Sequence, residues 1–243
     1  MASSSLLNPP LSLRLSSPKP LPSSSSRSPA PFPTTTCGPR DNRGPLQRGR
    51  TLSSEAIFAV QSLKRASASS SATSSLAAAD VTLRRLLKSD LLAALAELQR
   101  QGQWHLALKV FSFARLEPWY NPADFALYAE MAAAMARCGA GDQVDALVDE
   151  MLEEKERSGG FSPKDDVWKL TRLIRVLIAA GRGEAVRRVY EGMRKGACVG
   201  DEYLFRVLMN GLRKLGELKA ADVVQRDFKV WDEGGEVKGP LTL

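Results

Sequence analysis

The sequence offers few residues that could carry out catalysis. His105 is its only histidine and lies beside Trp104, so neither a Ser-His-Asp arrangement nor a cluster of histidine metal ligands can be built. The three cysteines, at positions 37, 138 and 198, are odd in number and widely spaced, which argues against a disulfide framework and a zinc site. Neither nucleotide-binding pattern, G-x-x-x-x-G-K-[ST] or G-x-G-x-x-G, occurs. We therefore expect a protein that is not an enzyme and that has no metal or other cofactor.

Carboxylates are plentiful, but they gather in segments that connect helix-forming stretches. Examples are Glu153, Glu154, Asp165 and Asp166. Acidic side chains in such segments are usually solvated. We expect these four to face water.

Aromatic, arginine and amide side chains recur at helical spacing in the C-terminal half. The first run is Trp168, Thr171 and Arg175, and the second is Tyr203, Arg206, Asn210 and Arg213. Residues three or four apart lie on one face of a helix. Aromatic rings stack on bases and guanidinium groups bind phosphates, so these runs predict contact with a single-stranded nucleic acid. Two other interpretations stay open: the arginines solvate an exposed helix face, and the two rings belong to the core.

The elements that must position these side chains are helices, because the chain after residue 50 is rich in helix formers and almost lacks β-branched alternation. Four segments share one sequence pattern, which consists of an apolar helix, a glycine turn and a second helix. Their turn glycines, Gly102, Gly139, Gly181 and Gly216, are 37, 42 and 35 residues apart. A repeat of about 35 residues predicts a solenoid of helical hairpins.

Burial explains why such hairpins must stack. Each has an apolar face too small to be stable alone, and only neighbouring hairpins can cover it. The second helices place large apolar or small residues at equivalent positions, and we expect these in the core: Ala107, Phe111, Met151, Tyr190, Met193 and Ala221. The segment from Glu154 to Gly160 is polar and predicts a lengthened connecting loop.

The N-terminal part differs sharply in composition. Residues 1–50 contain seven of the 34 lysines and arginines and only one of the 27 acidic residues. This part therefore carries +6 of the formal net charge of +7. It is rich in serine and proline and cannot bury enough apolar surface to fold. Residues 1–45 are therefore expected to be a disordered organelle transit peptide, for the chloroplast stroma first and the mitochondrion second. A tail that stays attached is the alternative.

The rest of the chain divides into segments where the amino-acid composition and the helical pattern change. Residues 50–66 predict the N-terminal helix of a first, degenerate repeat, and residues 67–78 predict a flexible serine-rich loop. Residues 79–232 hold the helical repeats, and residues 233–243 predict a disordered tail. No run of about 18 apolar residues occurs, so we expect no insertion into a membrane.

Two families of helical repeat have a period of about 34 to 35 residues: tetratricopeptide repeats, which bind peptides, and pentatricopeptide repeats (PPR), which bind RNA. When each turn glycine is taken as residue fifteen of a unit, the first three units close on aspartates, namely Asp124, Asp166 and Asp201. An aspartate before each following helix resembles the PPR pattern. Tyr128 and Phe205 also lie where that family has an aromatic residue, although Leu170 replaces it in the third unit.

Two segments, RGRTLSSEAIFAVQSLKRA and LLKSDLLAALAELQRQGQWHLALKVF, together with the short array, resemble the thylakoid assembly 8 group of short plant PPR proteins. The resemblance implies an all-α fold, a right-handed α-solenoid of about four to five PPR hairpins. It also implies a plastid protein that binds single-stranded RNA selectively, without catalysis, and assists the splicing of group II introns.

The resemblance further implies where RNA is read. In this family the fifth residue of a unit and its closing residue recognise one base, and here only Thr171 with Asp201 forms such a pair, which implies guanine. The expected RNA-binding residues are Trp168, Thr171, Arg175, Asp201, Tyr203, Arg206, Asn210 and Arg213.

The expected partners are an intron-containing organelle transcript and, in addition, a second copy of the chain or other splicing factors. The second unit presents an all-alanine face that could admit such a protein: Ala126, Ala129, Ala133 and Ala136. The same face, with the nearly neutral charge after residue 50, leaves one functional alternative open. That alternative is a scaffold that binds a peptide or partner helix in its concave face.

Overall fold

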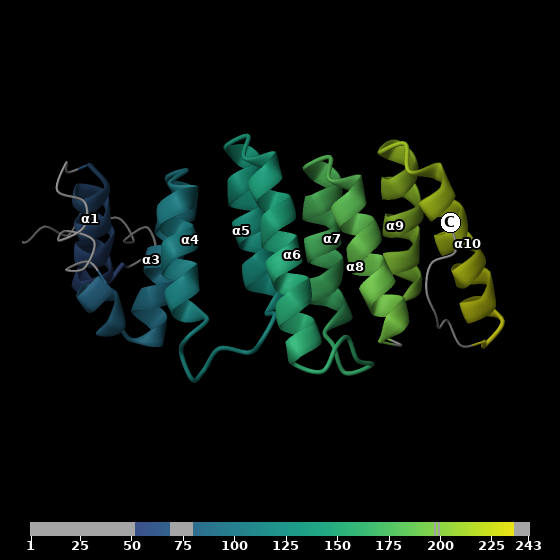
Figure 1. The fold of residues 1–243 in the computed structure, drawn as a ribbon, viewed down its shortest axis with the longest axis horizontal. Coiled ribbons are helices and arrows are strands. Elements are labelled where there is room, and N and C mark those ends of the chain that lie inside the picture. The colour runs from purple at the N-terminus through teal and green to yellow at the C-terminus, as the bar shows by residue number, and fades with distance from the viewer. Residues whose placement is uncertain (1–51, 69–79, 197, 199, 236–243) are drawn as a thin grey trace, which may run out of the picture. The chain divides into compact units, whose positions relative to one another are not determined.

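We describe a computed structural model of the chain, and the description covers residues 52–68, 80–196, 198 and 200–235. These residues all belong to the unit that runs from Arg50 to Leu243. Their regular structure is entirely helical (Figure 1). The predicted transit peptide, nearly all of the predicted serine-rich loop and most of the predicted tail lie outside the described residues. Within the described ranges, no helix combines the length and apolarity needed to traverse a bilayer.

Four helical hairpins follow α1 (Ser54–Ala68) and a short helical segment at residues 80–84. The first helices of the hairpins are α3 (Lys88–Arg100), α5 (Phe125–Arg137), α7 (Val167–Ala179) and α9 (Glu202–Lys214). The second helices are α4 (Trp104–Ala114), α6 (Gly141–Arg157), α8 (Gly183–Lys195) and α10 (Leu218–Asp232).

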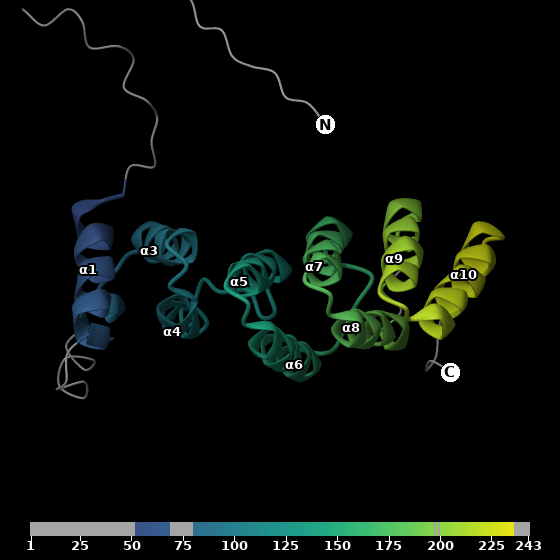
Figure 2. The same ribbon diagram turned by 90° about the horizontal axis from the view of Figure 1, so that it is seen from above.

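The hairpins pack side by side in chain order. Each first helix contacts the next one, from α1 through α3, α5 and α7 to α9, and α6 contacts α8. Figure 2 shows α3, α5, α7 and α9 in one row and α4, α6 and α8 in a second row. The predicted stacking of helical hairpins is confirmed.

Each first helix ends in the same way, at its turn glycine. Gly102, Gly139, Gly181 and Gly216 have φ angles of 70°, 73°, 75° and 82°. After α3, the Gln103 N–H donates to the Leu98 carbonyl at 2.9 Å and the Gly102 N–H donates to the Gln99 carbonyl at 3.3 Å. This is the Schellman arrangement, in which a residue in left-handed conformation satisfies the last carbonyls of a helix. The glycine spacing therefore marks real helix ends.

The closing aspartates begin the next helices. Asp124, Asp166 and Asp201 are the N-caps of α5, α7 and α9. Their carboxylates accept hydrogen bonds from the backbone N–H groups of Ala126, Lys169 and Leu204 at 3.0, 3.1 and 2.7 Å. An aspartate here stabilises the helix start by satisfying an orphan donor and opposing the positive end of the helix dipole. Helix capping alone is thus a sufficient local reason for this residue type.

The core lies between the two rows of helices. The residues that we expected there are all buried: Ala107, Phe111, Met151, Tyr190, Met193 and Ala221. Phe111 packs edge-on against Tyr128 of the next hairpin, with ring centroids 5.0 Å apart. Contacts of this kind between hairpins supply the burial that one hairpin lacks.

The segment from Glu154 to Gly160 is mostly helix rather than loop, so this expectation was wrong. Helix α6 continues to Arg157 and ends in a turn at Gly159 and Gly160, whose φ angles are 108° and 79°. The polar composition was misleading because one face of the added turn is covered by Tyr128 of α5 and by Arg115 of the preceding hairpin.

Glu154 shows that coverage, and its predicted solvation was wrong. The residue is 9% exposed; its carboxylate accepts a hydrogen bond from the Tyr128 hydroxyl at 2.6 Å and lies 3.5 Å from Nε of Arg115. A carboxylate tolerates burial when it gains such partners. Burial also raises the pKa of Tyr128 above its usual range, so the hydroxyl stays a donor. Asp165 is likewise sheltered, with Lys155 Nζ at 2.7 Å.

Candidate nucleic-acid interface

Helix α7 separates a buried side from an exposed stripe. Leu170, Leu173, Ile174 and Leu177 are fully buried. Trp168 is 72% exposed, and Arg172 and Arg175 are exposed beside it. Spacings of four and three residues place these three side chains on one face of the helix.

The same positions on the other first helices define what we call the first-helix stripe. They are the second, sixth, ninth and thirteenth residues after each N-cap, and all are exposed or half-buried. The members are Ser89, Ala93, Ala96 and Arg100 on α3; Ala126, Glu130, Ala133 and Arg137 on α5; Trp168, Arg172, Arg175 and Ala179 on α7; and Tyr203, Val207, Asn210 and Lys214 on α9.

The chemistry of the stripe changes along the array. On α3 and α5 its central residues are mostly alanine, whereas α7 and α9 present two aromatic rings, three cations and an amide. Trp168 and Tyr203 are 72% and 45% exposed, so neither ring belongs to the core. Because α7 and α9 pack against each other, their stripes are neighbours. Exposed rings beside cations can stack on bases while phosphates are neutralised.

Arg172 is a candidate that our sequence reasoning missed. We sampled the fifth residue of the unit, Thr171, whereas the exposed stripe passes through the sixth. The signal was present, since the apolar residues Leu170, Leu173 and Leu177 mark the buried side and leave Arg172 opposite to it. The Arg172 guanidinium lies 3.2 Å from the carboxylate of Glu130 on α5. Arg175 has no ion pair or hydrogen bond to any part of the chain that the structure describes.

Thr171 and Asp201, the expected base-reading pair, are both engaged in local hydrogen bonds. Thr171 is 3% exposed and its hydroxyl donates to the Val167 carbonyl at 2.7 Å. The Asp201 carboxylate caps α9. Recognition of guanine by this pair stays a prediction, and it requires the Thr171 hydroxyl to leave its present partner.

Arg206 and Arg213 lie along one edge of the first-helix stripe on α9, three or four residues from its members Tyr203 and Asn210. They occupy the repeat positions of Thr171, which is buried on α7, and of Ile178, which packs against Gly211 of α9. No described first helix follows α9, so the same positions are exposed there. Arg206 pairs with Glu202 and Arg213 donates to Gln225 at 2.6 Å. We call these two arginines the end face.

The all-alanine face of the second unit is only partly open. Ala129 is 1% exposed, and α5 packs closely against α7. Ala126, Ala133 and Ala136 keep partial exposure. The face therefore brings neighbouring hairpins together, as small residues do, and its remaining surface is a strip of alanines.

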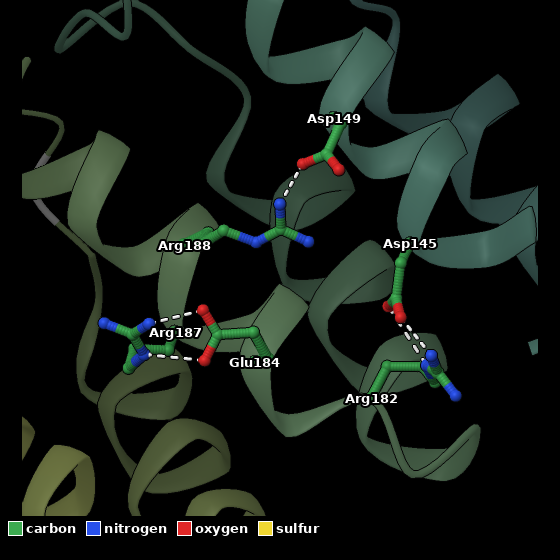
Figure 3. A network of polar contacts seen from close by, with 6 residues as sticks. All are labelled: Asp145, Asp149, Arg182, Glu184, Arg187 and Arg188. Carbon is green, nitrogen blue, oxygen red and sulfur yellow. Dashed lines mark hydrogen bonds and ion pairs between the residues drawn. The ribbon is translucent and has the colours of Figure 1, made fainter. Parts of the chain in front are cut away.

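Arginines of the second-helix row are held by carboxylates (Figure 3). Arg182, the N-cap residue of α8, pairs with Asp145 on α6, and Arg188 on α8 pairs with Asp149 on α6. Arg187 pairs with Glu184 on its own helix. Partly exposed pairs of this kind contribute about 0–1 kcal/mol each to stability. The paired carboxylates also offset the positive charge of these arginines, whereas Arg175 on α7 has no such partner among the described residues.

Comparison with known proteins decides the family. A curated protein of Arabidopsis thaliana, "Protein THYLAKOID ASSEMBLY 8, chloroplastic", is 42% identical over 198 residues, which cover 79% of this chain and 84% of the relative. A pentatricopeptide repeat-containing protein of Arabidopsis thaliana is 30% identical over 177 residues, covering 73% of this chain and 84% of the relative. The chain belongs to the pentatricopeptide repeat family.

A solved structure supports the same assignment to the PPR family. It is the crystal structure of THA8 in complex with Zm4 RNA, and the two chains share 48% sequence identity and a TM-score of 0.69 over 75% of this chain and 97% of that one. No family model matches the chain. The predicted fold class and the resemblance to short plant PPR proteins are confirmed. The chloroplastic relative confirms the chloroplast as the predicted location, and the stroma stays a prediction.

Proposed function

We propose that this PPR protein binds single-stranded RNA in the chloroplast and does not catalyse a reaction. The observation that carries the proposal is the exposed stripe of α7 and α9, which presents the rings of Trp168 and Tyr203 together with the guanidinium of Arg175, unpaired among the described residues. Rings and cations in one stripe can hold bases and phosphates of one strand at the same time. Support comes from the related THA8, whose solved structure contains RNA.

Each stripe residue has a distinct proposed role. Arg172 and Arg175 neutralise phosphates, which supplies most of the affinity and makes it sensitive to salt. Trp168 and Tyr203 stack on bases with little sequence preference. Asn210, exposed one helical turn from Arg206, offers an amide donor and an acceptor to a base edge. The alanine positions of α3 and α5 have no side chain that could select a base.

The proposed biological role is assistance in splicing group II introns, as the resemblance to the thylakoid assembly 8 group implies. One stripe with so few base-reading groups can specify little sequence. Selectivity for an intron-containing transcript would then come from further copies or other splicing factors acting together.

Paired charge-removal variants test the proposal. Purified protein should bind a fluorescently labelled single-stranded RNA, and Arg172→Ala/Arg175→Ala should weaken binding by roughly 10- to 100-fold near 0.1 M salt and flatten the salt dependence, because two phosphate contacts are lost. Arg187→Ala/Arg188→Ala removes the same charge from α8 and should change affinity by less than about 3-fold.

A third pair separates the stripe from the end face. Arg206→Ala/Arg213→Ala should have an effect between those two, because these arginines lie at the edge of the stripe rather than within it. Equal losses in all three double variants would contradict a defined site and indicate a general charge effect. Absence of RNA binding, with specific capture of a protein partner, would favour the scaffold function instead.

A further inference from the structure

One ion pair connects neighbouring hairpins within the first-helix stripe. Arg172 Nη2 on α7 lies 3.2 Å from Glu130 Oε1 on α5, and the two side chains are 53% and 40% exposed. The residues are 42 positions apart in the chain. The pair therefore exists only because the hairpins stack.

Glu130 is unusual in its place. Among the stripe residues, all of which the structure describes, it is the one carboxylate, and it pairs with Arg172 of α7. A carboxylate there is not required for packing, because Glu130 is half-exposed and the equivalent residues of α3 and α9 are Ala93 and Val207. The Glu130 carboxylate therefore occupies a position from which a phosphate could bind the Arg172 guanidinium.

Two electrostatic effects follow from that position. The carboxylate competes with a phosphate oxygen for the same N–H donors of Arg172. It also repels phosphates within a Debye length, about 10 Å at 0.1 M salt. The ion pair itself is weak because both side chains are half in water, so a bound strand can displace it.

We propose that Arg172 binds an RNA phosphate and that Glu130 restrains it, so that the Glu130–Arg172 pair lowers the RNA affinity of the stripe. This inference rests on the proposed RNA binding. Glu130 acts through Arg172. In the free protein its carboxylate pairs with the guanidinium, and this ion pair breaks when an RNA strand binds along α7. An RNA that engages several stripe residues together displaces the carboxylate, whereas one that reaches Arg172 alone does not.

The first test removes the negative charge and keeps the shape. Glu130→Gln in the full chain should raise affinity for a single-stranded RNA by roughly 3- to 10-fold near 0.1 M salt, since one competing and repelling charge is gone. The slope of log affinity against log salt should steepen by up to about 0.7, the contribution of one phosphate contact on a single strand. A merely structural role for Glu130 would not change that slope.

A matched control isolates the site from the net charge. Glu150 of α6 also pairs across hairpins, with Arg115, the C-cap residue of α4, at 2.8 Å, but it belongs to the second-helix row. Glu150→Gln makes the same charge change and should leave affinity within about 2-fold of wild type, because a screened charge away from the strand contributes little. Thermal unfolding should show both variants folded, with midpoints close to wild type.

The double variant Glu130→Gln/Arg172→Ala decides the mechanism. Its affinity should equal that of Arg172→Ala, because there is no guanidinium left to release. Equal gains from Glu130→Gln and Glu150→Gln, an undiminished gain in the Arg172→Ala background, or no gain at all would overturn the inference while RNA binding by wild type still stands. If wild type fails to bind RNA, the proposed function falls and this inference with it.

Discussion

Ile178 of α7 packs directly against Gly211 of α9, and a β-carbon at position 211 would overlap the Ile178 side chain. Gly211 is buried within a regular helix, so this close approach, and not an unusual backbone conformation, is the reason for glycine. The contact fixes how near two first helices come, and so sets the spacing of the stripes that they carry.

Gly211→Ala should therefore destabilise the protein even though alanine favours helix. The gain in helix propensity is about 1 kcal/mol, whereas overpacking a tight contact costs about 1–3 kcal/mol. We expect a net loss of up to about 2 kcal/mol in the free energy of unfolding, measured by urea denaturation. Lys214→Ala, on the exposed side of the same helix, should stay within about 0.5 kcal/mol of wild type. A stabilised Gly211→Ala protein would show that the helices can separate freely.

Removing the buried carboxylate of Glu154 should be more damaging than removing its tyrosine partner. Glu154→Ala leaves the Tyr128 hydroxyl and part of the Arg115 charge without a buried acceptor, which costs about 3–5 kcal/mol. Tyr128→Phe deletes only one hydrogen bond and should cost about 1–2 kcal/mol. Chemical denaturation of both variants checks the order, and the exposed Glu150→Gln serves as the mild reference on the same helix. The reverse order would mean that Glu154 is solvated in solution.

Stability should fall in alkaline solution because of two buried tyrosines, Tyr128 and Tyr190, and one partly buried tyrosine, Tyr120. Burial raises the pKa values of Tyr120, Tyr128 and Tyr190 above the ordinary value near 10. The folded state therefore keeps these hydroxyls protonated when the unfolded state has released the protons. The stabilisation is fully present below pH of about 10 and is lost progressively as pH rises above it. Unfolding measured by circular dichroism between pH 8 and 11 should show the loss, and Tyr190→Phe, which removes one such group, should reduce its steepness.

Trp168 should matter for RNA binding and hardly at all for folding. Its ring is 72% exposed, so Trp168→Ala should change the free energy of unfolding by less than about 0.5 kcal/mol. The same variant should lose about 1–3 kcal/mol of RNA-binding free energy if one base stacks on the ring, and Trp168→Tyr should recover part of that loss. Fluorescence anisotropy with labelled RNA gives the affinities. An unchanged affinity for Trp168→Ala would remove this residue from the site.

The local sequence was enough to predict the repeat and its ends. Glycine adopts left-handed backbone readily, so Gly102, Gly139, Gly181 and Gly216 mark where first helices stop. Aspartate caps helices through its own carboxylate, so Asp124, Asp166 and Asp201 mark where the following first helices start. These effects act within a few residues, and the sequence displays them without knowledge of the fold.

Which side chains reach the surface was decided by the tertiary structure. Thr171 and Arg206 occupy the same repeat position, yet Thr171 is buried on α7 and Arg206 is exposed on α9. The difference arises because α9 follows α7, whereas no described first helix follows α9. Glu154 lies in a polar segment that predicted a solvated loop, yet its carboxylate is buried against Tyr128 of α5. Sequence by itself determined the helices, their order and the family. The exposure of equivalent residues and the pairing of Arg172 with Glu130 depend on neighbouring hairpins, because burial and long-range electrostatics arise from contacts between segments distant in the chain.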